Sequence, residues 1–148
     1  MIVVVSDTSP IRALDFLGQL PLLKVLFDKV LVPPAVQNEL RSPPAQFAAV
    51  DLTQFDYFEI RAPQNIQQVQ QFLRVLDRGE SEALALALET NAQIILMDEL
   101  KGRKTAEQHG VVALGTLGIL LRAKSRGPEI SGDHRHQGKY PAVRYRER

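Results

Sequence analysis

The sequence contains no cysteine, and this absence excludes several kinds of structure. A chain without cysteine forms no disulfide and none of the common cysteine zinc sites, which fits a reducing compartment. No apolar run approaches the roughly 18 residues that a transmembrane helix needs. The N-terminal stretch MIVVV also lacks the basic lead and small-residue cleavage site of a signal peptide. We therefore expect a cytoplasmic protein that does not span a membrane.

Length and composition indicate one globular domain with a basic end. A chain of 148 residues with 45% hydrophobic residues can bury one sizeable core but not two. Residues 1–121 carry 10 Lys and Arg against 14 Asp and Glu, whereas residues 122–148 carry 8 against 3. An acidic body does not bind nucleic acid by bulk charge alone unless metal ions neutralise its carboxylates. We expect an ordered domain over residues 1–126 and a basic, flexible tail over residues 127–148.

Short apolar strands alternate with helical patterns along the chain. Expected strands lie at residues 2–5, in KVLV, at residues 57–60, in IILM and in VVAL. Expected helices lie at residues 10–17, just after Pro21, in AVQNELR, at residues 65–76, in GESEALALALE, at residues 100–109 and in GTLGILLRAKSR. Such alternation is typical of an α/β fold, in which a parallel sheet is covered by helices on both faces.

Two of these strands end on an aspartate. Asp7 follows the run VVVS, and Asp98 follows IILM. Ser9 and Pro10 then favour the start of a helix, so Asp7 should lie in the turn between strand and helix. The carboxyl ends of parallel strands share one edge of a sheet, where open α/β sheets bind ligands. If the two strands are neighbours, both carboxylates can reach one ion.

Three glutamates are further candidates for that edge. Glu39 shares the apolar side of its helix with Ala35 and Val36, and Glu80 and Glu82 open an almost wholly apolar helix. Carboxylates gathered in a partly dry site destabilise the fold unless a cation intervenes, and a divalent ion would resolve the conflict. Each acid also has a structural explanation: Asp7 can cap a helix, Glu39 can pair with a neighbour, and acids are favoured at helix N-termini.

Other residue types point away from several chemistries. His109 is the only histidine before the tail and lies at a helix end, which disfavours a nuclease that uses histidine as acid and base. No glycine-rich phosphate loop of the Walker type is present. Some basic side chains could contact phosphate or could form a solvated helix face, and these are Arg12, Arg78, Lys101, Arg103 and Lys104.

Four blocks of the sequence resemble one known family. VVVSDTSPI, VPPAVQNEL, LDRGESEALALALETNAQIILMDE and GTLGILLRAK occur in order with fitting gaps over about residues 1–126. They are similar to the PIN-domain superfamily, in the branch close to VapC-type toxins. The resemblance implies a three-layer α/β/α sandwich with a five-stranded parallel sheet.

The resemblance also implies a function. It points to an endonucleolytic ribonuclease that uses Mg²⁺ or Mn²⁺, and the matching acids are Asp7, Glu39, Glu82 and Asp98, with Glu80 as a further possible ligand. Candidate contacts to the RNA substrate are Ser6, Thr8, Arg12, Lys101, Arg103 and Lys104. Toxin-like members form homodimers and are held inactive by a small antitoxin protein, for which the apolar helices at residues 20–27 and 65–76 offer candidate surfaces.

The sequence departs from the family at two places, and two rival functions remain. The third acid is usually aspartate, whereas here it is Glu82 with Glu80 two residues earlier, so either can reach the ion. The tail diverges as well, and we expect its His134 and His136 to be incidental. A phosphatase with a nucleophilic Asp7 is disfavoured because DTSP lacks a second aspartate two positions on. A non-catalytic module that binds nucleic acid or protein is the main alternative.

Overall fold

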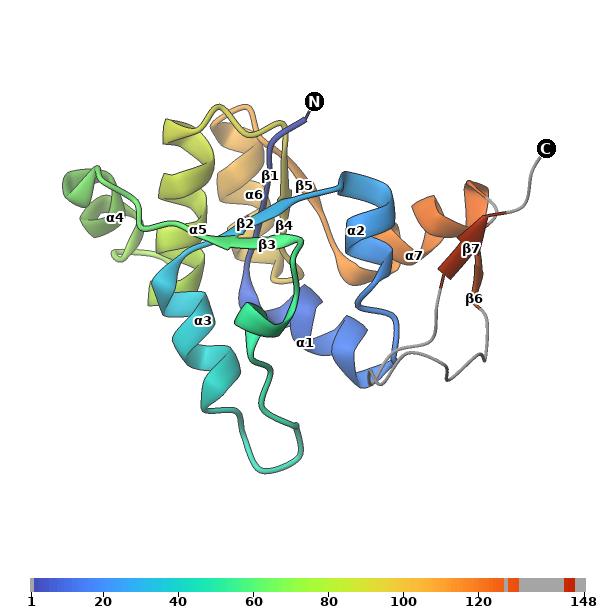
Figure 1. Ribbon diagram of the computed structural model, residues 1–148. Coiled ribbons are helices and arrows are strands. Elements are labelled where there is room, and N and C mark those ends of the chain that lie inside the picture. The colour runs from blue at the N-terminus through green and yellow to red at the C-terminus, as the bar shows by residue number, and fades with distance from the viewer. Residues whose placement is uncertain (1, 127, 131–142, 146–148) are drawn as a thin grey trace.

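The computed structural model describes residues 2–126, 128–130 and 143–145. A five-stranded parallel sheet lies between two layers of helices (Figure 1), which confirms the three-layer α/β/α fold expected from the sequence. The strands are β1 (Val4–Ser6), β2 (Val30–Val32), β3 (Phe58–Ile60), β4 (Ile94–Leu96) and β5 (Val112–Leu114). The order across the sheet is β3-β2-β1-β4-β5, and all neighbouring strands run parallel.

Helices cover both faces of the sheet. Those in the described residues are α1 (Thr8–Phe16), α2 (Leu22–Phe27), α3 (Pro34–Arg41), α4 (Ile66–Phe72), α5 (Arg78–Glu89), α6 (Leu100–Gln108) and α7 (Thr116–Ser125), with a short 3-10 turn η1 (Leu52–Gln54). Alternate strand residues face opposite ways, so Val4 packs into a core with α1, α2, α3 and α7, while Val5 packs into another with α4, α5 and α6. Both cores are apolar, as a sheet buried on two faces requires.

The chain changes direction across the sheet at β1. From β1 it moves outward through β2 to β3, and it then returns to place β4 on the other side of β1. Ser6 pairs with Leu96 in this central ladder. The crevice beyond the carboxyl ends of β1 and β4 is therefore the topological switch point, where open α/β sheets bind their ligands. Asp7 and Asp98 follow these two strands, so the condition under which both carboxylates could reach one ion is met: the strands are neighbours.

The boundaries of the first two elements differ from the sequence-based expectation. The first strand begins at Val4 rather than at residue 2, and Ile2 is 40% exposed. Ser6 extends the strand because it pairs with Leu96 of β4, and its buried hydroxyl donates to the backbone oxygen of Asp7. The helix then begins at Thr8 instead of Pro10. Pro10 is accommodated because the first helical residues have no intrahelical partner for their N–H groups.

A later helix is also shorter than expected. The helix expected over residues 65–76 ends at Phe72, and the chain then makes a turn before α5. Asn65 caps its start, since its side chain accepts a hydrogen bond from the amide of Gln68. The apolar residues beyond Phe72 include Leu76, which is buried without being helical. The apolar spacing of residues 73–76 thus resembled a helix, although Leu76 is buried in a turn.

Two short strands follow the last helix. They are β6 (Pro128–Ile130) and β7 (Val143–Tyr145), and they pair antiparallel. His134 and His136 lie outside the described residues. The domain boundary at residue 126 and the flexibility of the tail stay predictions. In the part of the chain that is described, no helix combines the length and the apolar character needed to cross a membrane.

Candidate functional site

Asp7 lies at the centre of the candidate site. Its backbone amide donates to the carbonyl oxygen of Leu96 at 2.9 Å, which fixes the end of β1 against β4. The residue is the N-cap of α1 in backbone terms, but its side chain makes no capping hydrogen bond. It is only 4% exposed. Helix capping therefore does not account for this carboxylate.

The environment of Asp7 is acidic as well as buried. Its pKa is raised from 3.8 to about 7, by burial above all and also by the charges of Asp77, Glu39 and Asp98. A hydrogen bond from the amide of Thr8 acts in the opposite direction but is outweighed. All three charged groups that act on Asp7 are acids, so it exchanges a proton near neutral pH. Such a site favours a cation.

Asp77 belongs to this acidic site and was not among the residues predicted from the sequence. It caps α5, since its Oδ1 accepts from the amide of Glu80 at 2.8 Å. The sequence DRGE has the Asp-x-x-Glu spacing of a capping box, which is the signal that could have identified Asp77. Its charge reaches both Asp7 and Glu80.

Glu80 faces the same site from the first turn of α5. It is 6% exposed, and burial is the largest cause that raises its pKa above the usual value. A hydrogen bond to the side chain of Asp77, the charge of Asp77 and the charge of Asp7 raise it further. Gly102 of α6 leaves room for it, because a Cβ at that position would lie 2.7 Å from Glu80 Oε2. Asp77 and Glu80 therefore form a carboxyl pair that retains a proton.

Glu82 has different partners. Its Oε1 accepts from the amide of Ala35 at 3.1 Å, and its Oε2 accepts from Arg78 Nη1 at 3.1 Å. Two residues along a helix differ in direction by about 200°, so Glu80 and Glu82 leave α5 on different sides. Glu82 thereby joins α5 to the first turn of α3, where an acceptor is stabilised by the free backbone amides.

Glu39 reaches the site from α3. The hydroxyl of Thr8 donates to Glu39 Oε2, and Arg12 Nη2 donates to the Glu39 carbonyl oxygen at 3.1 Å. On its other side the carboxylate lies against Gly79, where a Cβ would come within 2.6 Å of Oε1. Thr8 and Arg12, predicted as substrate contacts, thus both hold Glu39. Ser6, also predicted, is buried with its hydroxyl on a backbone oxygen.

Asp98 is exposed at the end of β4 and caps a helix. Its Oδ1 accepts from the amide of Thr116, and its Oδ2 accepts from the Thr116 hydroxyl, both at 2.7 Å. A Cβ at Gly115 would lie 2.9 Å from Oδ1, so glycine is needed for this approach. Its charge also reaches Asp7. Asp98 therefore has two roles. It faces the switch point of the sheet, and it also stabilises the start of α7.

Basic side chains follow Asp98 directly. Lys101, Arg103 and Lys104 lie in the first half of α6, and Lys101 and Lys104 are exposed. Among the residues that the structure describes, none of the three forms an ion pair. Unpaired cations beside an acidic site can attract phosphate groups.

The acids have the chemistry of a metal site but are not arranged as one. Within the described residues, no three histidine or acidic side chains converge on a point that could hold an ion. The donors are all carboxylate oxygens, which Mg²⁺ and Mn²⁺ prefer. Asp7 is buried among acids, so a cation would relieve its repulsion. The residue types therefore suit such an ion. In this structure, however, Thr8 donates a hydrogen bond to the Glu39 carboxylate, and Thr116 donates to that of Asp98.

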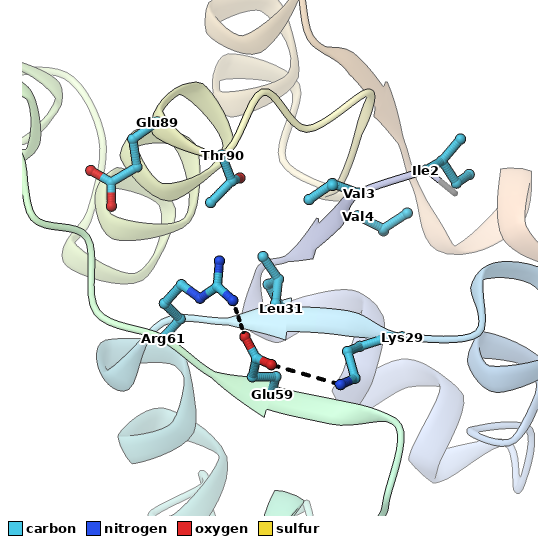
Figure 2. A pocket seen from close by; sticks show the side chains of 9 residues that line it. All are labelled: Ile2, Val3, Val4, Lys29, Leu31, Glu59, Arg61, Glu89 and Thr90. Atoms are coloured by element: carbon cyan, nitrogen blue, oxygen red, sulfur yellow. Dashed lines mark hydrogen bonds and ion pairs between the residues drawn. The ribbon is translucent and has the colours of Figure 1, made fainter.

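A pocket without this acidic character lies elsewhere (Figure 2). It has a volume of about 370 Å³ and lies near the amino ends of β1 and β2, with Leu31 and Val3 in its lining. Glu59 lies between two cations at its rim and pairs with both Lys29 and Arg61. The charges that line this pocket are therefore largely compensated by one another, in contrast to those of the acidic site.

Comparison with known proteins decides the family. The sequence matches the family DUF3368, described as a PIN domain, over residues 3–131. The chain belongs to the PIN-domain family. A search of curated proteins finds no significant match. PIN domains are typically nucleases and generally use divalent metal ions, so nucleic acid is the expected class of substrate.

Proposed function

We propose that this PIN domain is a divalent-metal-dependent ribonuclease that hydrolyses internal phosphodiester bonds of RNA. One observation carries the proposal. Asp7 is buried at the switch point of the sheet, caps no helix with its side chain, and lies in the field of three other acids. A protein that keeps this arrangement for stability alone would do better with a neutral residue, because the repulsion disfavours folding.

The acids at the switch point are the proposed ligands of Mg²⁺ or Mn²⁺. Asp7 and Asp98 follow adjacent strands, Glu39 faces Asp7 from α3, and the Asp77 and Glu80 pair faces it from α5. We assign Glu82 a supporting role, because it leaves α5 on a different side from Glu80 and its oxygens are directed to Ala35 and the exposed Arg78. When bound, the ion would neutralise the charge that develops on the phosphate during hydrolysis.

The protein's own residues supply the remaining parts of the reaction. The cations of α6, Lys101, Arg103 and Lys104, would hold the RNA backbone beside Asp98. The Asp77 and Glu80 pair keeps a proton at neutral pH, which loading with an ion would release. Thr8 orients the Glu39 carboxylate, and Thr116 orients that of Asp98.

A role as the toxin of a toxin–antitoxin pair is part of the proposal. A small antitoxin or a second copy of the chain needs an apolar surface, and α4 offers one. Ile66 is 59% exposed, and Leu73 and Val75 are exposed beyond the helix. The leucines of α2 and its Phe27 are instead buried, which leaves residues 20–27 little apolar surface to offer. Gel filtration and scattering of the protein alone and with the product of a neighbouring gene test both partners; a strict monomer at high concentration contradicts the dimer.

A non-catalytic nucleic-acid-binding module is the second candidate. It is favoured by the hydrogen bonds that engage both oxygens of Asp98 and by the lack of a three-ligand metal group among the described residues. In that case the acids would serve the fold, and metal ions would change little.

RNA cleavage with Mg²⁺ or Mn²⁺ separates the two candidates. We expect cleavage with either ion, none with a chelator, and none by the Asp7→Asn variant. The melting temperature should rise with metal, since an ion that binds only the folded state stabilises it by mass action. A pure wild-type protein that neither cleaves RNA nor gains stability with metal would contradict the ribonuclease. Cleavage that persists in Asp7→Asn would contradict the assignment of the site.

A further inference from the structure

The three cations of α6 do not lie in equivalent surroundings. Lys101 and Lys104 are exposed, whereas Arg103 is half-buried. Gly102 and Ala106 form the buried side of the same helix, and Arg103 is the next residue after Gly102. The side chain of Arg103 therefore leaves α6 at the border between the protein interior and solvent. This position distinguishes Arg103 from the two lysines.

The guanidinium of Arg103 lies beside Asp98 and Gly115. A Cβ at Gly115 would lie 3.4 Å from Arg103 Nη1 and 2.9 Å from Asp98 Oδ1, so both charged groups border one small space. The backbone of Gly115 has φ −85° and ψ 175°, which any residue adopts. A side chain at this position would displace Asp98 and touch Arg103, so glycine is required by the close approach and not by the turn. Arg103 is thereby placed at the switch point of the sheet.

Arg103 has carboxylates nearby but pairs with none of them. Glu99 and Glu107 are four residues away along the chain, which is the spacing of an ordinary ion pair on a helix surface. Among the residues that the structure describes, Arg103 nevertheless forms neither an ion pair nor a side-chain hydrogen bond. The oxygens of Asp98 accept from Thr116 instead. The charge of Arg103 therefore remains available beside the acidic site.

An anion can reach this guanidinium. The side chain of Arg103 has no hydrogen-bond partner in the described part of the chain, and none of its nitrogens is shielded from solvent. A half-buried arginine has lost part of its water without gaining an acceptor, and an anionic oxygen would restore the missing hydrogen bonds. The guanidinium presents its N–H donors as a rigid fork, which matches two oxygens of one phosphate group.

We propose that Arg103 is a catalytic residue, whose guanidinium binds the RNA phosphate that is hydrolysed at the acidic site. The inference rests on the proposed function and separates one cation of α6 from the other two. Negative charge builds up on the phosphate oxygens during hydrolysis, and a cation held beside them stabilises that charge. Lys101 and Lys104 then supply a general attraction for the RNA backbone, because their exposed ammonium groups are flexible point charges.

RNA binding without metal tests the phosphate contact independently of cleavage. A short unstructured RNA labelled with fluorescein is titrated with the full chain in an Asp7→Asn background, and chelator is present so that no ion contributes. Arg103→Lys keeps the charge but loses the fork, so we expect binding to weaken by about tenfold. Arg74→Lys is the matched control, because Arg74 is an exposed arginine beyond α4, and it should bind as the parent does. Equal binding by Arg103→Lys and the parent overturns the proposal.

A second background separates a phosphate contact from mere compensation of the Asp98 charge. Arg103→Gln removes the positive charge, and it should weaken RNA binding about equally in the Asp7→Asn background and in the Asp7→Asn, Asp98→Asn background. An effect that disappears once Asp98 is neutral overturns the proposal, because Arg103 then acts only through Asp98. Arg103 variants that bind RNA as the parent does but no longer bind the product of a neighbouring gene also overturn it, and they assign the arginine to a protein carboxylate.

Cleavage assays separate this inference from the proposed function. With wild-type Asp7, Arg103→Lys should lower kcat by about a hundredfold, the loss found when one donor to the developing charge is removed. Lys101→Ala should instead raise KM and reduce the salt dependence of binding. A rise in KM alone for Arg103→Lys overturns the role at the reacting phosphate and leaves the ribonuclease intact. RNA binding that depends on Arg103, without cleavage by the wild type at any metal concentration, supports the phosphate contact and refutes the ribonuclease.

Discussion

The Glu39 carboxylate occupies the space that a side chain at position 79 would fill. A Cβ on Gly79 would lie 2.6 Å from Glu39 Oε1 and 3.1 Å from its Oε2. The same carboxylate accepts a hydrogen bond from Thr8 on α1. Glu39 is thus held between α1 and α5, directly beside the buried Asp7 whose pKa its charge raises.

Gly79→Ala should therefore disturb the site without unfolding the protein. Alanine favours the helix over glycine by about 1 kcal/mol, which offsets part of the crowding. We expect a melting temperature close to that of the wild type and a clear loss of both metal-induced stabilisation and RNA cleavage. Gly118→Ala is the matched control, because its Cβ would crowd Leu114 at 2.5 Å rather than an acid. Equal activity of both variants would show that Glu39 is not needed.

The stability of the metal-free protein should depend on pH through Asp7. The folded protein keeps this proton up to about pH 7, whereas the unfolded chain releases it near 3.8. The folded state therefore binds more protons between these values, and the free energy of unfolding falls as pH rises through this window. Asp7→Asn removes this loss.

We expect Asp7→Asn to be more stable than the wild type at about pH 8 with chelator, and to lose that advantage at about pH 4. Each pKa unit corresponds to about 1.4 kcal/mol, so the difference reaches a few kcal/mol. Thermal unfolding of both proteins at the two pH values measures it. If the free energies of unfolding of the two proteins changed with pH in the same way, the raised pKa of Asp7 would be contradicted.

The two glutamates of α5 should respond differently to removal of their charge. Glu80→Gln is expected to reduce the metal-induced rise in melting temperature, because Glu80 faces Asp77 and Asp7. Glu82→Gln keeps an oxygen for the amide of Ala35 and loses only the ion pair with the exposed Arg78, which costs less than about 1 kcal/mol. Its metal response should persist. The reverse result in differential scanning fluorimetry would make Glu82 the ligand.

Asp98 combines two roles that substitution can separate. Thr116→Val removes the hydroxyl that donates to Asp98 Oδ2 and keeps the amide that donates to Oδ1, so stability should fall by about 1 kcal/mol while cleavage remains. Asp98→Asn keeps one acceptor oxygen for the amide of Thr116 but should abolish cleavage. Urea unfolding and RNA cleavage of the two variants give the comparison. Similar activity losses in both would indicate that Asp98 acts only through α7.

The sequence predicted the fold class and the ends of the two strands that Asp7 and Asp98 follow. Apolar runs identified the strands that precede Asp7 and Asp98, because a strand buried on both faces of a sheet reads as a nearly continuous apolar run. The prolines before Ala35 and after Arg41 delimited α3. These signals are local, because an apolar run or a proline specifies the backbone conformation of its own segment of the chain.

The composition of the acidic site was decided by the tertiary structure. Asp77 reads as an ordinary helix cap in the sequence, and it caps α5 in the fold; only the packing of α5 against the sheet brings its charge to Asp7. Which of Glu80 and Glu82 faces the acidic site depends on the rotation of α5 about its axis. The sequence does not specify this rotation, because α5 is apolar on almost all sides. The order β3-β2-β1-β4-β5 likewise depends on where β4 docks after a long connection. Local patterns therefore determined which residues form strands, helices and turns, while long-range packing determined which carboxylates meet.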